Sequence, residues 1–191
     1  EGMFVYGHPR SQVNVISVSS IPSIVGALLP TIYNPNLVWD ENSQRIALAE
    51  LEVAAMTSAL VGYDPARAGG VFTFGGTGTE LYGVRIGIEK ALPGSMKDGV
   101  REDAAIFASR QSHYCRNSIA SWLGLGARNV VTVKSGADNA MRLDLLEEAV
   151  RKHVDAGGKI AAFIATLGTT DAFGLDDIEG IARIRDALVR D

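Results

Sequence analysis

The stretch GGVFTFGGTGTELYGVRIGIEKALPG, residues 69–94, decides the fold, because it joins a short apolar run to a helical pattern through a cluster of glycines. The run at 70–74 is rich in β-branched and aromatic residues and predicts a strand. The segment 79–92 predicts a helix, which Pro93 and Gly94 end. Its apolar positions follow helical spacing and are Leu81, Val84, Ile88 and Leu92. A strand, a glycine loop and a helix in direct succession are typical of α/β proteins.

The same alternation continues to the end of the chain. Further strands are predicted at 104–109, 129–134 and 159–168, and further helices at 117–126, 142–158 and from about residue 176, where Asp176 or Asp177 can cap the helix. Strands and helices that alternate over short connections predict a parallel sheet covered by helices on both faces. We therefore assign the chain to the α/β class.

Residues 1–68 have a different pattern, an irregular arm followed by a long helix at 43–62. We expect two parts: the arm and its helix at 1–68, and the first part of a larger domain at 69–191. The second part is expected to be incomplete, because the pattern calls for another strand after the last helix.

Composition excludes several classes of protein. The 191 residues are 47% apolar and 21% charged, with a net charge of −4, which argues against disorder and against nucleic-acid binding. The single cysteine, Cys115, rules out an intrachain disulfide. The apolar stretch 15–33 is interrupted by Pro22 and Pro30 and does not predict a membrane span. With no signal peptide recognised, we expect a cytoplasmic protein.

Three features point to a ligand at the carboxyl ends of the strands. The glycine loop FGGTGTE opens a helix, whose free N–H groups and positive dipole end favour an anion. His113 follows the strand at 104–109, and Gly168, Thr169 and Thr170 follow the strand at 159–168. In parallel sheets ligands bind at this edge.

Each feature also has a structural explanation. The loop matches neither the dinucleotide pattern, whose third glycine is replaced by Leu81, nor the P-loop pattern. A plain glycine turn is common between strand and helix, and a lone histidine is more often a surface residue than a catalytic one.

Taken together in their order and spacing, the motifs resemble the group II pyridoxal-phosphate-dependent amino-acid decarboxylases. The similar segments are FVYGHP, ALAELEVAAMTSALVGYDP, GVFTFGGTGTEL, SHYCRNSIASWLGLG and ATLGTTDAFGLDDI. The resemblance implies the type I fold of pyridoxal-phosphate-dependent transferases. This sequence departs from the family pattern at Leu81-Tyr82 and at Tyr114-Cys115, which puts a particular subfamily in doubt.

The resemblance also implies roles for individual residues. Gly78 and Thr79 would bind the cofactor phosphate, His113 would stack on the pyridine ring, and Thr170 would lie near the 3′-hydroxyl or carboxyl region. His8 and Asn14 fall in the arm that approaches the substrate. The implied activity is decarboxylation of an amino acid by a homodimer with pyridoxal phosphate. An aldolase-type lyase of the same fold is the alternative within the enzymes.

In the family, the aspartate that pairs with the pyridine nitrogen and the Schiff-base lysine lie beyond the matched segments. Here no lysine lies in a His-Lys motif; the lysines are Lys90, Lys97, Lys134, Lys152 and Lys159. We therefore expect an N-terminal portion of the enzyme, inactive by itself. A cleaved or split enzyme with a complementary C-terminal polypeptide, an expression or proteolytic fragment, and a non-catalytic binding subunit are the three explanations.

Overall fold

The computed structural model describes residues 2, 6–12 and 18–190, with the side chains of 189 and 190 left out. The chain divides into two compact units, Glu1–Phe72 and Thr73–Asp191. The predicted parts, an arm with its helix at 1–68 and the first part of a larger domain at 69–191, stay a prediction.

The first unit contains three helices: α1 (Ile21–Tyr33), α2 (Asp40–Ser43) and α3 (Ile46–Leu60). The long helix predicted at 43–62 corresponds to α3. The expectation of an irregular arm is wrong for α1, which is a regular helix with Pro30 inside it. Its start is well specified, because the Ser20 hydroxyl accepts a hydrogen bond from the N–H of Ser23 at 3.3 Å and Pro22 lies in the first turn.

The second unit is built on a three-stranded parallel sheet in the order β2-β1-β3. The strands are β1 (Ala104–Ser109), β2 (Val130–Val133) and β3 (Lys159–Ile164), so three of the four predicted strands are confirmed. Every residue of the central strand β1 is buried, as expected of a strand with helices on both faces.

The strand predicted at 70–74 is absent. Val71, Phe72 and Phe74 are exposed, and the backbone turns at Thr73, whose carbonyl accepts the N–H of Gly75 at 2.8 Å. β-Branched and aromatic residues favour a strand only where a neighbouring strand can bond to their backbone. None of the described strands pairs with this segment.

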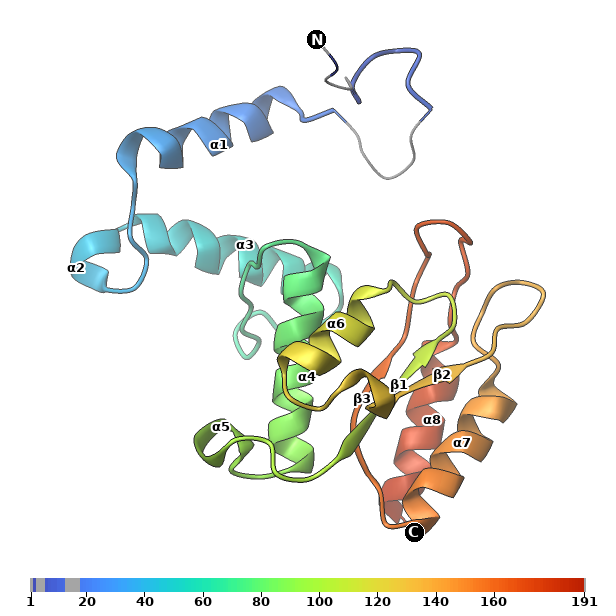
Figure 1. Cartoon of the computed structure of the whole chain (residues 1–191). Helices are drawn as coiled ribbons and strands as arrows, with labels where there is room; N and C mark the ends of the chain where they lie inside the picture. The colour runs from blue at the N-terminus through green and yellow to red at the C-terminus, as the bar shows by residue number, and fades with distance from the viewer. Residues whose placement is uncertain (1, 3–5, 13–17, 191) are drawn as a thin grey trace. The chain divides into compact units, whose positions relative to one another are not determined.

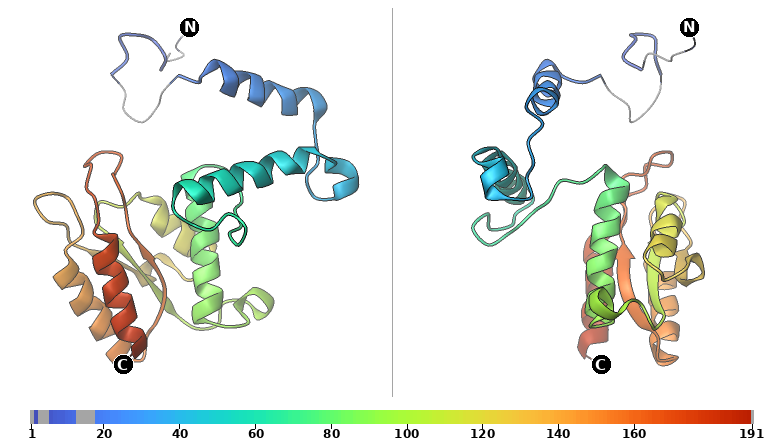
Figure 2. Two further views of the ribbon diagram at one scale, coloured as in Figure 1. Left: turned by 180° about the vertical axis from the view of Figure 1, so that it is seen from behind. Right: turned by 60° about the vertical axis from the view of Figure 1, so that its left-hand side comes forward.

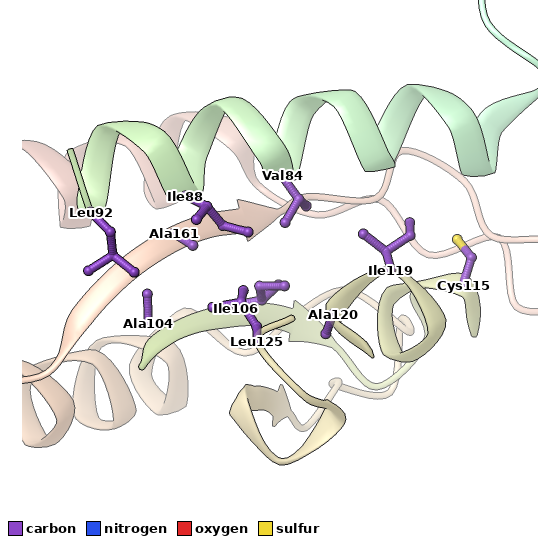
Figure 3. Close-up of a cluster of buried hydrophobic side chains, with 10 residues drawn as sticks. All are labelled: Val84, Ile88, Leu92, Ala104, Ile106, Cys115, Ile119, Ala120, Leu125 and Ala161. Atoms are coloured by element: carbon purple, nitrogen blue, oxygen red, sulfur yellow. The ribbon is translucent and has the colours of Figure 1, made fainter. Parts of the chain in front are cut away.

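Two pairs of helices cover the two faces of the sheet (Figures 1 and 2). On one face lie α4 (Gly76–Ala91) and α6 (Cys115–Trp122), and on the other α7 (Leu143–Asp155) and α8 (Ile178–Arg190). Figure 3 shows the first core, where Ile88 of α4, Ile106 of β1 and Ile119 of α6 meet. The second unit also contains two short helices, the α-helix α5 (Ser95–Asp98) and the 3₁₀-helix η1 (Ala127–Asn129).

Within residues 2, 6–12 and 18–190, no helix is both long enough and apolar enough to cross a lipid bilayer. In the same residues no group of histidine, cysteine, aspartate and glutamate side chains is arranged to hold a metal ion.

Candidate active site at the carboxyl edge of the sheet

Hydroxyl groups join the carboxyl ends of the three strands. Because the strands are parallel, the segments that follow β1, β2 and β3 leave the sheet at one edge (Figure 1). The Oγ atoms of Ser109 and Ser135 lie 3.1 Å apart, and the Oγ of Ser112 lies 2.8 Å from Oγ1 of Thr166. These contacts hold the loop after β1 against the loops after both of its neighbours.

A pocket of about 320 Å³ lies at this edge. Its walls come from the loop after β1, the start of α6 and the loop after β3. The lining residues are Arg110, Gln111, Ser112, His113, Tyr114, Arg116, Thr169, Thr170 and Asp171. The structure therefore brings His113 and Thr170 together, as the sequence predicts for the carboxyl edge. A volume of this size is at the lower end of the range for small-molecule sites.

His113 is exposed and its ring orientation is fixed from its own segment. Its Nδ1 accepts a hydrogen bond from the N–H of Cys115 at 3.3 Å, which places the proton of the neutral imidazole on Nε2. The ring of Tyr114 lies alongside, with the two centroids 4.1 Å apart and the planes tilted by 34°. The histidine thus presents an oriented aromatic surface with an N–H donor.

The glycine turn before α4 is tightly packed inside. Gly75 has φ +83°, and the Oγ1 atoms of Thr73 and Thr79 lie 2.9 Å apart across the turn. Gly78 is buried, and a Cβ there would lie 3.0 Å from the Cβ and Oγ1 of Thr73 and 3.2 Å from the ring of Phe74. The first N–H groups of α4 have no partner within the helix, and free N–H groups at a helix N-terminus favour an anion.

A buried thiol connects the glycine turn with the histidine segment. Cys115 at the start of α6 donates a hydrogen bond from Sγ to Oε2 of Glu80 in α4, at 3.2 Å. Burial, followed by the interaction with Glu80, raises the pKa of the Cys115 thiol to about 11, while a hydrogen bond with Thr77 works in the opposite direction. Figure 3 shows Cys115 and Ile119 directed from α6 toward α4. His113 therefore lies two residues from a contact with the first turns of α4.

The other four sequence-predicted residues are Gly78, Thr79, His8 and Asn14. Gly78 and Thr79 do not line the pocket. His8 belongs to the first unit, where it is exposed and its Nδ1 accepts the N–H of Arg10 at 3.1 Å. Asn14 lies outside the described residues. The roles of all six candidate residues stay predictions.

Sequence reasoning did not single out Asp176 as part of this edge. Of the two proposed helix caps, Asp177 fits the role, since its Oδ1 accepts the N–H of Gly180 at 2.8 Å. Asp176 instead is buried and accepts N–H groups of Met141 and Thr166. Two adjacent aspartates offer equal capping signals in a sequence, so only the tertiary contacts distinguish them.

Comparison with known proteins identifies the family. The sequence model of one protein family, the pyridoxal-dependent decarboxylase conserved domain, matches residues 4–188 of this chain. The chain belongs to this family, the group II decarboxylases, and its cofactor is pyridoxal phosphate. The predictions of the family and of the α/β fold are both confirmed.

Individual relatives agree with this assignment. The chain is 26% identical over 183 residues to L-2,4-diaminobutyrate decarboxylase of Rhizobium meliloti (strain 1021), covering 95% of this chain and 36% of the relative. It is 29% identical over 181 residues to human cysteine sulfinic acid decarboxylase, with coverages of 93% and 36%. The apo crystal structure of mouse CSAD superposes with a TM-score of 0.89 at 27% identity, covering 95% and 38%. The chain thus spans little more than a third of the length of these relatives.

The residues at the carboxyl edge suit the chemistry of pyridoxal phosphate. The cofactor has a phosphate ester, a flat aromatic ring and a ring hydroxyl. The structure offers a helix N-terminus whose close-packed Gly78 leaves no room for a side chain, an exposed imidazole, and the hydroxyls of Thr169 and Thr170. Each donor type has a matching acceptor or surface on the cofactor.

Proposed function

We propose that this chain is the N-terminal portion of a pyridoxal-phosphate-dependent amino-acid decarboxylase and binds the cofactor at the carboxyl edge of its sheet. The observation that carries the proposal is that His113 and Thr170, which are 57 positions apart, line the same pocket. Both residues lie in segments that resemble motifs of the family. The contact between Cys115 and Glu80 supports it, because it fastens the histidine segment to the helix that opens with the glycine turn.

Each residue has a definite task in this proposal. N–H groups of the first turn of α4 bind the phosphate, with Gly78 keeping the turn compact and Thr79 bracing it through Thr73. The ring of His113 packs on the pyridine ring, and the Thr170 hydroxyl binds a polar group of the cofactor. When bound, pyridoxal phosphate supplies a ring that takes up the electron pair left by the departing carboxylate. The contribution of these residues is to bind the cofactor and to hold its ring in a fixed orientation.

The whole protein is proposed to act on an amino acid, as a homodimer in the cytoplasm. The relatives' names include both a basic and an acidic amino acid, and the pocket lining mixes Arg110 and Arg116 with Asp171, so both kinds of substrate belong in the assay. His8 and Asn14 are proposed to approach the substrate. We also propose that the 191 residues alone do not decarboxylate, because no lysine lies in the family's Schiff-base motif.

Cofactor binding is tested by calorimetric titration with pyridoxine 5′-phosphate, whose lack of an aldehyde prevents reaction with surface lysines. We expect binding of this compound and much weaker binding of unphosphorylated pyridoxine. His113→Ala should weaken binding by roughly threefold to tenfold, the range for loss of one aromatic contact, whereas His113→Phe should retain most of it. His153→Ala, in α7 and bonded to the carbonyl of Lys159, is the matched control. Equal binding of both compounds would refute the phosphate site.

Activity is tested by release of CO₂ from 2,4-diaminobutyrate and cysteine sulfinate in the presence of pyridoxal phosphate. Intact-mass analysis identifies every polypeptide in the sample, including any complementary C-terminal polypeptide with the lysine segment. Protein purified from its source should release CO₂ from an amino acid. The 191-residue chain alone should not, and release by that chain would overturn the proposal that it is inactive.

A further inference from the structure

Asp176 holds together two loops at the carboxyl edge of the sheet. The residue is buried, with 4% of its surface exposed. Oδ1 accepts the N–H of Met141, in the connection between β2 and α7, at 2.7 Å. Oδ2 accepts the N–H of Thr166, two residues after the end of β3, at 2.8 Å. Figures 1 and 2 show these two loops side by side at the same end of the sheet. One carboxylate thus fixes the spacing of two segments that are far apart in sequence.

The loop that carries Thr170 starts at Thr166 and ends at Asp176. The N–H of Asp176 donates to the carbonyl of Thr166 at 3.0 Å, and the N–H of Gly168 donates to the carbonyl of Gly174 at 2.8 Å. These bonds close the base of a narrow loop with Thr169 and Thr170 at its far part. Asp176 forms one end of this base, and its carboxylate and its N–H both bond to Thr166 at the other end. The direction of the loop therefore depends on that residue.

A second connection runs from Thr166 to His113. The Thr166 hydroxyl lies 2.8 Å from the hydroxyl of Ser112, the residue before the histidine. The guanidinium of Arg116 donates to the carbonyls of Ser112 and His113, the latter at 3.0 Å. A displacement of the Thr166 backbone should therefore move the backbone of Ser112 and, with it, that of His113.

We infer that Asp176 is a positioning residue, which sets the Thr170 loop and, through Thr166 and Ser112, the His113 segment at the spacing that forms the pocket. The inference rests on the proposed function only in taking this pocket as the cofactor site. Asp176 itself does not line the pocket and is assigned no contact with the cofactor.

The chemistry of the site explains why a carboxylate is needed. Both of its oxygens face backbone N–H donors, and buried hydrogen bonds to an ionised acceptor are stronger than neutral ones. Asparagine has the same shape but only one acceptor oxygen, so its NH₂ group would face one of the two N–H donors. Asp176→Asn therefore breaks at least one of the two ties without removing side-chain volume.

The test is amide hydrogen exchange and ¹⁵N NMR of the 191-residue chain without cofactor. For Asp176→Asn we expect exchange at the N–H of Thr166 or Met141 to be faster by roughly tenfold or more, and the backbone signals of both Thr170 and His113 to shift. Asp177→Asn is the matched control, because that residue caps α8 through Gly180. It should leave the signals of Thr170 and His113 in place, because the Oδ1 of asparagine caps a helix as well as that of aspartate.

Ser112→Ala separates the two connections and remains informative if Asp176→Asn does not fold. Loss of this hydroxyl should shift the signals of Thr166, its partner 54 residues away, while leaving the exchange at Met141 unchanged. A Thr166 signal that stays in place would contradict this connection. A shift of Thr170 without His113 in Asp176→Asn, or equal effects of the Asp176 and Asp177 variants, would overturn the inference. Failure of the chain to bind pyridoxine 5′-phosphate would refute the proposed function but would not change these signals.

Discussion

Substitution of Gly78 by alanine tests the packing of the glycine turn. The added Cβ would lie 3.0 Å from two atoms of Thr73 and 3.2 Å from the ring of Phe74, closer than ordinary contacts. Overpacking of this kind costs about 1–3 kcal/mol. Alanine in place of glycine inside a helix contributes about 1 kcal/mol in the opposite direction. We therefore expect Gly78→Ala to lower the free energy of unfolding by up to about 2 kcal/mol.

Urea unfolding followed by circular dichroism measures this difference. Gly76→Ala is the matched control, since a Cβ at Gly76 meets nothing within 4 Å. That variant should be as stable as the parent chain or more stable, by up to about 1 kcal/mol. If the two variants have the same free energy of unfolding, the contact between Gly78 and Thr73 does not constrain the turn. In a second step, Gly78→Val should abolish binding of pyridoxine 5′-phosphate, and unchanged binding would show that the loop has another role.

Three further predictions concern the core and the titratable groups. The pKa of Cys115 is raised to about 11 from 9.0, so this thiol should react slowly with iodoacetamide at pH 8 and faster in Glu80→Gln. The contribution of the neutral Cys115 thiol to the free energy of unfolding is fully present below pH 9 and is lost as the pH rises toward 11, and urea unfolding across that range checks it. The Arg142 guanidinium lowers the pKa of Asp144 to about 2, so the contribution of this ion pair to the stability of the fold is present above pH 3.8 and is lost as the pH falls toward 2. An NMR titration of the Asp144 carboxyl should show a midpoint near 2 that moves toward 3.8 in Arg142→Ala. Phe107 is fully buried at the centre of the sheet, and Phe107→Ala should lower the free energy of unfolding by about 3–5 kcal/mol in urea titrations; a loss below about 1 kcal/mol would contradict the assigned core.

The regular part of the second unit follows closely from the sequence. The run at 104–109 is apolar at nearly every position and has no polar alternation, which is the pattern of a strand buried on both faces, and β1 has those bounds. The helix predicted at 79–92 begins three residues earlier in the structure, at Gly76, because glycines give no local signal for a helix start.

What the sequence did not predict depends on contacts between distant segments. The run at 70–74 has strand composition but no described strand beside it, so composition alone was misleading. The close approach of Gly78 to Thr73 and the two ties of Asp176 arise only after the chain has folded. At the site, motif order pointed to the residues that share a pocket, whereas the residues that hold them there had no signature of their own.

The strand order has a consequence for the time at which the pocket forms. β1 lies between β2 and β3, and the hydroxyl contact between Ser112 and Thr166 spans 54 residues. Contacts of such separation form late, because the intervening chain must first lose its freedom. We expect β1, β2 and α6 to associate earlier and the pocket to appear only when β3 docks. A ligand of this pocket should then slow unfolding while leaving the folding rate unchanged, since it meets no binding surface until β3 is in place.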